Sequence, residues 1–188
     1  MKRSLELELR RQSVHFLGVI AVLVILFVER TAATIMLGGF LALLILLSFY
    51  RAKRAFSSQW LEKFTIKRER PGAFPLSGAV FFFLGVLCAF LLYQPLYAAA
   101  ATAVLAVGDS VSTVAGKIWG RHKLPFDGGR SWEGSLAFFA FSAAILLLFV
   151  RPEKALVAAF LTALVEMLPK LDDNFTVPIA AGLFLTLL

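Results

Sequence analysis

The stretch Gly108–Ser135, GDSVSTVAGKIWGRHKLPFDGGRSWEGS, gathers glycine, serine, acidic and basic residues between two apolar segments. The chain around it is oily: 60% of its 188 residues are hydrophobic, and its mean hydropathy is +0.83. Ionisable residues are costly at membrane depth and mark functional sites when they occur there. Glycine, serine, aspartate, lysine and arginine are also the residue types that bind phosphates and their metal ions. The stretch is therefore our candidate active site of a membrane enzyme.

Apolar segments recur along the whole chain. Several are shorter than the ~20 residues that cross a bilayer comfortably, and short spans of this kind pack inside a bundle or thin the membrane locally. We predict an all-α fold: a polytopic integral membrane helical bundle of about seven transmembrane helices, formed by residues 1–188 as a single membrane-embedded domain. The predicted spans are 14–28, 31–50, 74–93, 95–115, 133–150, 154–168 and 176–188.

Lysine and arginine are spread very unevenly over the connections between these segments. Sixteen of the 19 basic residues fall in the tail 1–13, the loops 51–72 and 116–132, and Lys170. By the positive-inside rule the N-terminus, the tail and both loops are cytoplasmic, and the C-terminus lies outside. This topology explains the net charge of +7, so we expect no nucleic-acid partner. We predict an integral cell membrane protein whose active site faces the cytoplasm.

Small residues recur every fourth position in the candidate site. Close packing of two helices through small residues would explain such a stripe by itself. A phosphate-binding surface would use the same residues, because their small size lets a ligand approach the backbone. The sequence leaves both interpretations open for Gly108, Ser112, Gly116 and Gly120.

A second set at the same spacing carries charge. Residues four apart stay on one slowly turning helix face, and this face carries Asp109 at its apolar end and Lys117 and Arg121 at its polar end, with Thr113 between them. A structural ion pair from Asp109 to Lys117 is one interpretation, although two turns exceed the usual spacing of such pairs. We favour a carboxylate that binds Mg²⁺ beside cations that bind phosphates.

The end of the quoted stretch has the pattern of a helix start. Ser131 is suited to cap a helix, with Glu133 in the first turn, and this capping role is sufficient to explain both residues. The same helix N-terminus offers backbone N–H groups to a phosphate. Lys117, Arg121, Lys123 and Arg130 lie nearby in the sequence and favour polyphosphate binding.

A third group follows the sixth apolar segment. Glu166 lies inside an apolar run, where a functional role is the default interpretation. Asp172, Asp173 and Asn174 form an oxygen-rich cluster suited to a hard cation, and a polar loop before the next helix is the alternative. We expect Asp109, Glu166 and Asp173 to converge if the fourth and sixth spans pack together.

Two histidines complete the candidates. His15 stands where the first apolar run begins, so it is a candidate acid, base or hydrogen-bond donor, and a packing role at the interface is the alternative. His122 lies in the 116–132 loop and is the weaker candidate.

These motifs resemble those of the CTP-dependent polyprenol and diacylglycerol kinases, which include dolichol kinase and phytol kinase and are related to the phosphatidate cytidylyltransferases. The resemblance rests on GDSVSTVAGKIWGRHK at 108–123, RSWEGSLAFF at 130–139, RRQSVH at 10–15 and ALVEMLPKLDDNFTVPIAAG at 163–182. Arg11 and Arg130 depart from it, because the family often has lysine there, which keeps the charge but changes the geometry. The chain is also much shorter than eukaryotic dolichol kinases.

The resemblance implies a reaction in which CTP donates its γ-phosphoryl group to the hydroxyl of a polyprenol- or dolichol-type membrane alcohol, with Mg²⁺ as cofactor. A diacylglycerol kinase, a CDP-lipid synthase that releases pyrophosphate, and a small membrane transporter are the alternatives, and the oligomeric state stays open. The predicted catalytic residues are Asp109, Glu133, Asp173 and His15. The predicted metal ligands are Asp109, Glu166, Asp172 and Asp173. The predicted nucleotide- and phosphate-binding residues are Ser112, Gly116, Lys117, Gly120, Arg121, Lys123, Arg130, Ser131, Ser135 and Asn174.

Overall fold

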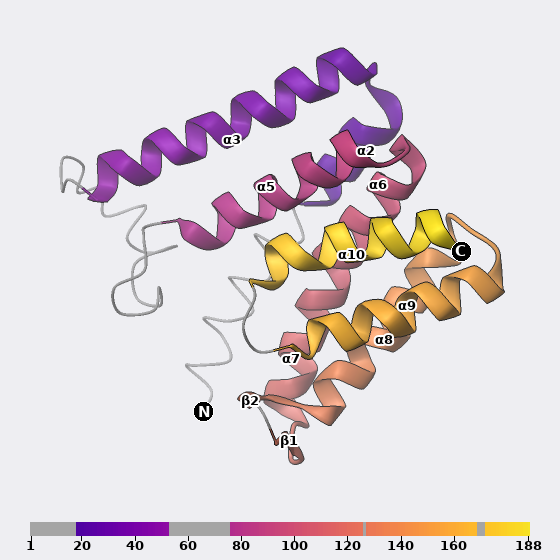
Figure 1. Cartoon of the computed structure of the whole chain (residues 1–188). Helices are drawn as coiled ribbons and strands as arrows, with labels where there is room; N and C mark the ends of the chain where they lie inside the picture. The colour runs from indigo at the N-terminus through magenta and orange to yellow at the C-terminus, as the bar shows by residue number, and fades with distance from the viewer. Residues whose placement is uncertain (1–17, 53–75, 126, 169–171) are drawn as a thin grey trace.

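The computed structural model describes residues 18–52, 76–125, 127–168 and 172–188 as helices packed side by side, with one small hairpin (Figure 1). His15, the tail 1–13 and almost all of the loop 51–72 lie outside these residues, so the predictions made for them stay predictions. The elements are α2 (Val19–Phe27), α3 (Arg30–Ala52), α5 (Ser77–Leu92), α6 (Pro95–Ala103), the π-helix η1 (Val104–Asp109), α7 (Ser110–Ile118), β1 (Lys123–Leu124), β2 (Asp127–Ser131), α8 (Trp132–Leu146), α9 (Pro152–Glu166) and α10 (Asp173–Leu187).

The helices follow the predicted apolar segments, and α6, η1 and α7 together form the fourth of them. Two helical stretches within the described residues are long and apolar enough to cross a membrane, Arg30–Arg51 and Pro95–Ile118. Three shorter apolar helices accompany them, Ser77–Leu92, Trp132–Leu146 and Asp173–Leu187. The helical architecture is thus confirmed, whereas the seven crossings and their orientation remain predictions.

Many of the buried positions are alanines, while many large apolar side chains are exposed. In α9 the buried positions include Ala155, Ala158 and Ala159, while Phe160 and Leu164 are exposed on the same helix. A helix in lipid gains little from burying a leucine, since the hydrocarbon is equally apolar, and it packs through residues that allow close backbone approach. The arrangement is the one expected of helices surrounded by lipid.

The outer face of α3 shows the same feature most strongly. Ile35, Leu46 and Phe49 are each more than half exposed on this helix. Soluble monomers rarely present a contiguous apolar surface of this extent. The face is therefore suited to hydrocarbon.

The short connections 28–30, 93–95 and 151–154 lie at one end of the bundle, together with the C-terminus (Figure 1). There the Arg30 guanidinium donates to the Phe90 carbonyl at 3.4 Å and lies over the Phe90 ring, 5.8 Å from its centroid. Lys154 Nζ donates to the Tyr97 hydroxyl at 3.0 Å. We refer to this as the connection end. The hairpin and the quoted stretch lie at the other end, which we call the site end.

At the site end the structure differs from the sequence-based predictions in two details. The predicted all-α fold contains a two-stranded antiparallel sheet, in which Lys123 pairs with Ser131 and Leu124 with Asp127. The helix of the quoted stretch ends at Ile118, so Arg121 does not continue its charged face. Trp119 is the C-cap, with φ −115° and ψ −8°, and its N–H donates to the Ala115 carbonyl.

Helix α10 closes the bundle by packing against α5, α6 and α9. Its approach to α5 is close at Gly85, where a Cβ would come within 2.5 Å of the Asn174 carbonyl oxygen and 2.9 Å of Pro178. Glycine is required there because no side chain fits between the two backbones. This contact fixes the beginning of α10 against the rest of the bundle.

Candidate functional site

A cavity of about 340 Å³ lies at the site end, where α7, the hairpin and the ends of α8, α9 and α10 meet. It combines acidic, basic, hydroxyl and glycine residues that are far apart in the sequence. Most of the predicted site residues line it. The lining residues are Asp109, Ser112, Thr113, Gly116, Lys117, Gly120, Lys123, Gly129, Arg130, Ser131, Gly134, Ser135, Glu166 and Asp173.

Helix α7 forms one wall of the cavity. Asp109, Thr113 and Lys117 stand four residues apart and all three line it, as expected for one helix face. The π-helix η1 ends at Asp109. A single π-helical turn within an α-helix is rare and is frequently found at functional sites. It shifts the residues that precede Asp109 relative to the regular helix that follows.

The beginning of α8 forms the adjoining part of the wall. The buried Ser131 caps the helix, since its Oγ accepts a hydrogen bond from the Gly134 N–H at 3.2 Å. The Trp132 N–H is also engaged, with the His122 carbonyl at 3.0 Å. Capping is thus the observed role of Ser131, and these two N–H groups already have partners.

The small-residue stripe brings α7 and α8 into contact. A Cβ on Gly134 would meet the Ser112 carbonyl oxygen at 3.1 Å and the Gly116 Cα at 3.3 Å. A Cβ on Gly120 would collide with the Gly116 carbonyl oxygen. Close helix packing, one of the two interpretations of the stripe, is therefore present, and the same residues leave the cavity wall without side chains.

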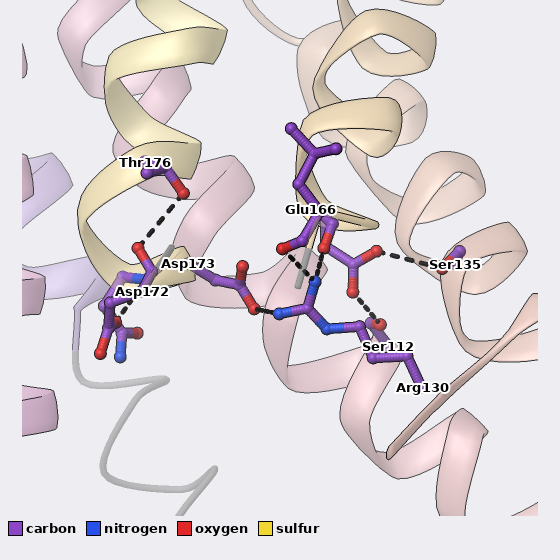
Figure 2. A network of polar contacts seen from close by, with 9 residues as sticks. Ser112, Arg130, Ser135, Glu166, Asp172, Asp173 and Thr176 are labelled. Carbon is purple, nitrogen blue, oxygen red and sulfur yellow. Dashed lines mark hydrogen bonds and ion pairs between the residues drawn. The ribbon is translucent and has the colours of Figure 1, made fainter. Parts of the chain in front are cut away.

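Glu166 joins three helices in the interior (Figure 2). Its side chain is 3% exposed at the end of α9. Ser112 of α7 donates to Oε1 at 3.2 Å, and Ser135 of α8 donates to Oε2 at 3.1 Å. Both carboxylate oxygens are thus engaged. Because a buried carboxylate needs hydrogen-bond donors, the two serines stabilise the Glu166 side chain in its buried position.

Arg130 of β2 reaches across the cavity (Figure 2). Its Nη2 donates to Asp173 Oδ2 at 2.5 Å. Its Nη1 donates to the carbonyl oxygens of Glu166 and Leu168, the latter at 3.1 Å. One guanidinium therefore links the hairpin to the end of α9 and the beginning of α10. The sequence predicts that Arg130 binds phosphate, whereas in the structure its guanidinium donates to groups of the protein.

Two predicted residues beside Asp173 do not line the cavity. Asp172 is exposed and caps α10, because its Oδ1 accepts a hydrogen bond from the Asn174 N–H at 3.1 Å (Figure 2). Asn174 faces α5, where its Nδ2 would lie 3.8 Å from a Cβ on Gly78. The polar-loop interpretation of this cluster therefore describes Asp172, while Asp173 points into the site.

Glu133, one of the predicted catalytic residues, is not among the residues that line the cavity. Its Oε1 accepts hydrogen bonds from the backbone N–H groups of Arg121 and His122 at 3.2 Å each. The His122 Nδ1 lies 2.7 Å from the same oxygen. Glu133 thus fastens the segment before the hairpin to the start of α8, and the Arg121 side chain does not line the cavity.

The donors fit a magnesium site built from two carboxylates and a phosphate. Within the described residues no group of three or more His, Cys, Asp or Glu side chains is positioned to hold a metal ion. Mg²⁺ is usually held by one or two carboxylates and completed by substrate phosphates and water. Asp109 and Asp173 line the same cavity, and Asp173 Oδ1 is buried without a hydrogen-bond partner among the described residues. A cation would satisfy that oxygen.

The sequence did not single out three lining residues: Thr113, Gly129 and Gly134. Thr113 was on the charged face but carried no assigned role. Gly129 and Gly134 flank Arg130 and Ser131, so the motif itself indicated them. Because glycine has no side chain, Gly129 and Gly134 leave space in the cavity that is also lined by Lys117 and Lys123.

Taken together, the cavity gathers cations and carboxylates at one end of an apolar bundle. The chain is similar to the chloroplast protein phytol kinase 1 of Arabidopsis thaliana, with 26% identity over 136 residues that cover 62% of this chain and 45% of the relative. The chain thus matches less than half the length of that relative. No model of a known protein family matches the chain. No solved structure matches it either.

Proposed function

We propose that this protein is a lipid-alcohol kinase that transfers the γ-phosphoryl group of CTP to the hydroxyl of a polyprenol- or phytol-type membrane alcohol. The observation that carries the proposal is the cavity itself, which collects Lys117, Lys123, Asp109 and Asp173 at the end of an apolar bundle. The similarity to a phytol kinase supports the same class of reaction. CTP as the donor and an isoprenoid alcohol as the acceptor come from the motif resemblance.

Phosphoryl transfer requires positioned charge more than covalent chemistry from the protein. In our proposal Lys117 and Lys123 contact the phosphates, because both line the cavity and their ammonium groups neutralise phosphate charge. Asp109 and Asp173 would hold Mg²⁺, which neutralises charge on the phosphates when bound. The glycines of the α7–α8 wall allow the phosphate chain to approach the backbone.

The lipid hydroxyl attacks the γ phosphorus, and the bond from that phosphorus to the β-phosphate bridging oxygen breaks. CDP leaves, and the hydroxyl proton passes through a cavity carboxylate such as Asp173 to water. Holding the hydroxyl in line with that bond supplies much of the rate enhancement. The acceptor tail stays in the hydrocarbon around the bundle, where the exposed leucine and phenylalanine side chains lie. The cavity at the bundle end is where a soluble nucleotide meets such an acceptor.

The test is an assay of the purified protein with CTP and, separately, phytol, a polyprenol, diacylglycerol and phosphatidic acid in mixed micelles. The proposal expects CDP and a lipid monophosphate with one of the alcohols. Parallel reactions with ATP measure donor preference. Pyrophosphate together with a CDP-lipid from phosphatidic acid would instead identify a cytidylyltransferase. If neither CTP nor ATP is consumed with any of the acceptors, the proposed function is wrong.

A further inference from the structure

Arg130 contacts both sides of the connection between α9 and α10. Nη1 binds the carbonyl oxygens of Glu166 and Leu168, where α9 ends, and Nη2 binds Asp173, where α10 begins. The last carbonyls of a helix have no partner within the helix, and a cation beside them is favourable. One side chain therefore caps α9 and fixes the position of α10.

The same contacts divide the two oxygens of the Asp173 carboxylate. Oδ2 is held by the guanidinium, whereas Oδ1 is buried and has no hydrogen-bond partner among the described residues. A buried carboxylate oxygen without a partner is costly unless a cation or a donor satisfies it. Since the guanidinium is planar and reaches three acceptors at once, it fixes the rotation of the carboxylate as well as its place.

Glu166 holds the other side of this arrangement. Its carboxylate is bound by Ser112 and Ser135, so α7 and α8 fix the end of α9 to which Arg130 is attached. The chain of contacts runs from α7 and α8 through Glu166 and Arg130 to Asp173 (Figure 2). Every member of this chain lines the cavity.

We propose that Arg130 is a positioning residue: it grips Asp173 by Oδ2 and the end of α9 by two carbonyls, so that Oδ1 is the oxygen presented to the cation that accompanies the nucleotide. This inference rests on the proposed function for the identity of the ligand. It assigns Arg130 no direct contact with the phosphates. It therefore corrects our expectation that Arg130 is one of the phosphate-binding cations.

The first test needs no catalysis. Thermal unfolding of the full chain in detergent is measured for wild type, Arg130→Gln, Asp173→Asn and the double variant. Arg130→Gln breaks this partly buried ion pair and the two hydrogen bonds to the end of α9, so it is expected to lower Tm by about 5 °C. The double variant should unfold within about 2 °C of Arg130→Gln, because both changes remove one interaction. Arg151→Gln, an exposed arginine at the connection end, is the matched control and should leave Tm unchanged.

A second measurement follows the ligand. Mg²⁺ added together with CTP should raise the Tm of the wild type above its value with CTP alone, since a ligand that binds only the folded state stabilises it. This Mg²⁺-dependent increment should be lost in Arg130→Gln, whereas the rise produced by CTP alone should remain. In the activity assay Arg130→Gln should lower kcat on the order of 100-fold, as expected when a reacting group is misplaced, while KM for CTP changes less than about 3-fold. A raised KM with unchanged kcat would show that Arg130 binds phosphate directly.

Additive Tm changes in the four-protein cycle would overturn the inference, because Arg130 would then not act through Asp173. An undiminished Mg²⁺-dependent increment in the Tm of Arg130→Gln would overturn it as well. A wild type that binds Mg²⁺ and CTP but phosphorylates no alcohol would contradict the proposed function and leave the positioning role supported by the thermal measurements.

Discussion

The two ends of the bundle use charge in different ways. At the connection end Arg30 and Lys154 lie against the aromatic rings of Phe90 and Tyr97, and Glu29 caps α3 in an exposed position. At the site end Glu166 and Arg130 are bound by several partners from different elements, and Glu166 is almost fully buried.

This difference in how charged side chains are held indicates which end of the bundle carries the function. A cation–π contact near the surface contributes on the order of 1 kcal/mol or less to stability, so Arg30 and Lys154 join helices at the connection end without burying a carboxylate. Burying charge is costly and is tolerated where the chemistry requires it. The site end holds its charges in a cavity that is large enough for a ligand, which is why we place the function there.

Asp109→Asn should have the largest effect on activity. The substitution removes one of the two carboxylates that we propose for Mg²⁺ and should reduce CDP formation by about 10³-fold, the order expected when charge stabilisation of the transferred phosphoryl group is lost. Folding should be preserved, because Asp109 is only partly buried and the amide has the same shape. Initial rates with saturating CTP and the best acceptor of the panel measure the effect, beside Tm in detergent.

Glu153→Gln is the matched control for this variant, since it removes an exposed carboxylate in the first turn of α9 at the connection end. It should retain the wild-type rate. Equal rates for Asp109→Asn and wild type would refute the assignment of Asp109 to the metal.

The second largest effect concerns stability. Glu166→Ala removes the acceptor of two buried serine hydroxyls and should destabilise the protein by about 3 kcal/mol, because the hydroxyls are left unsatisfied and a void is created. Lys154→Met at the connection end loses one contact with Tyr97 and should cost about 0.5–1 kcal/mol. Chemical or thermal unfolding in detergent ranks the two variants. A larger loss of unfolding free energy in Lys154→Met than in Glu166→Ala would contradict the conclusion that the site end depends more strongly on its charged contacts.

Glycine substitutions examine the packing that supports the site end. Gly85→Ala places a methyl group 2.5 Å from the Asn174 carbonyl oxygen, so α5 and α10 must separate, at a cost of about 1–3 kcal/mol. Since Asp173 begins α10, activity should fall together with Tm. Gly39→Ala on α3 has no atom within 4 Å of the new Cβ, so it should leave activity unchanged and should not lower Tm, because alanine is the better helix former. A Gly85→Ala protein with wild-type Tm would mean that this contact relaxes freely.

The sequence was informative about helices and about the residues of the site. Long apolar runs predict helices because an apolar segment in lipid must satisfy its backbone hydrogen bonds internally, and the observed helices follow those runs. The four-residue spacing placed Asp109, Thr113 and Lys117 on one face, and all three line the cavity. Asp109, Glu166 and Asp173 line the same cavity, although the sixth segment, α9, packs mainly on α8 and α10 and not on the fourth segment as expected.

The features that could not be predicted from the sequence depend on contacts between distant residues or have no local sequence pattern. The capping role of Ser131 was foreseen, because a cap is a local pattern. The engagement of Arg130 by Glu166 and Asp173 was not, because these partners are 36 and 43 residues away. The π-helical turn before Asp109 has no local signature either, since VLAVGD is an ordinary apolar sequence ended by glycine and aspartate.

The smallest expected effect comes from Glu29 at the connection end. Its carboxylate accepts hydrogen bonds from the backbone N–H groups of Thr31 at 2.9 Å and Ala32 at 3.0 Å. These backbone hydrogen bonds lower the pKa of Glu29 below its ordinary value of 4.5. A carboxyl group whose pKa is lowered by folding adds stability above its ordinary pKa, and this stability is lost as the pH falls through the lowered value.

Glu29→Gln should therefore lower Tm slightly at neutral pH, by about 1–2 °C as expected for an exposed helix cap. The difference from wild type should shrink as the pH is lowered below 4.5, because the wild-type carboxylate becomes protonated and no longer accepts both hydrogen bonds as an anion. Tm series of the two proteins from neutral to acidic pH measure this. A difference that stays constant over the whole series would mean that the cap acts through shape alone, and the contrast would then hold only for buried charge at the site end.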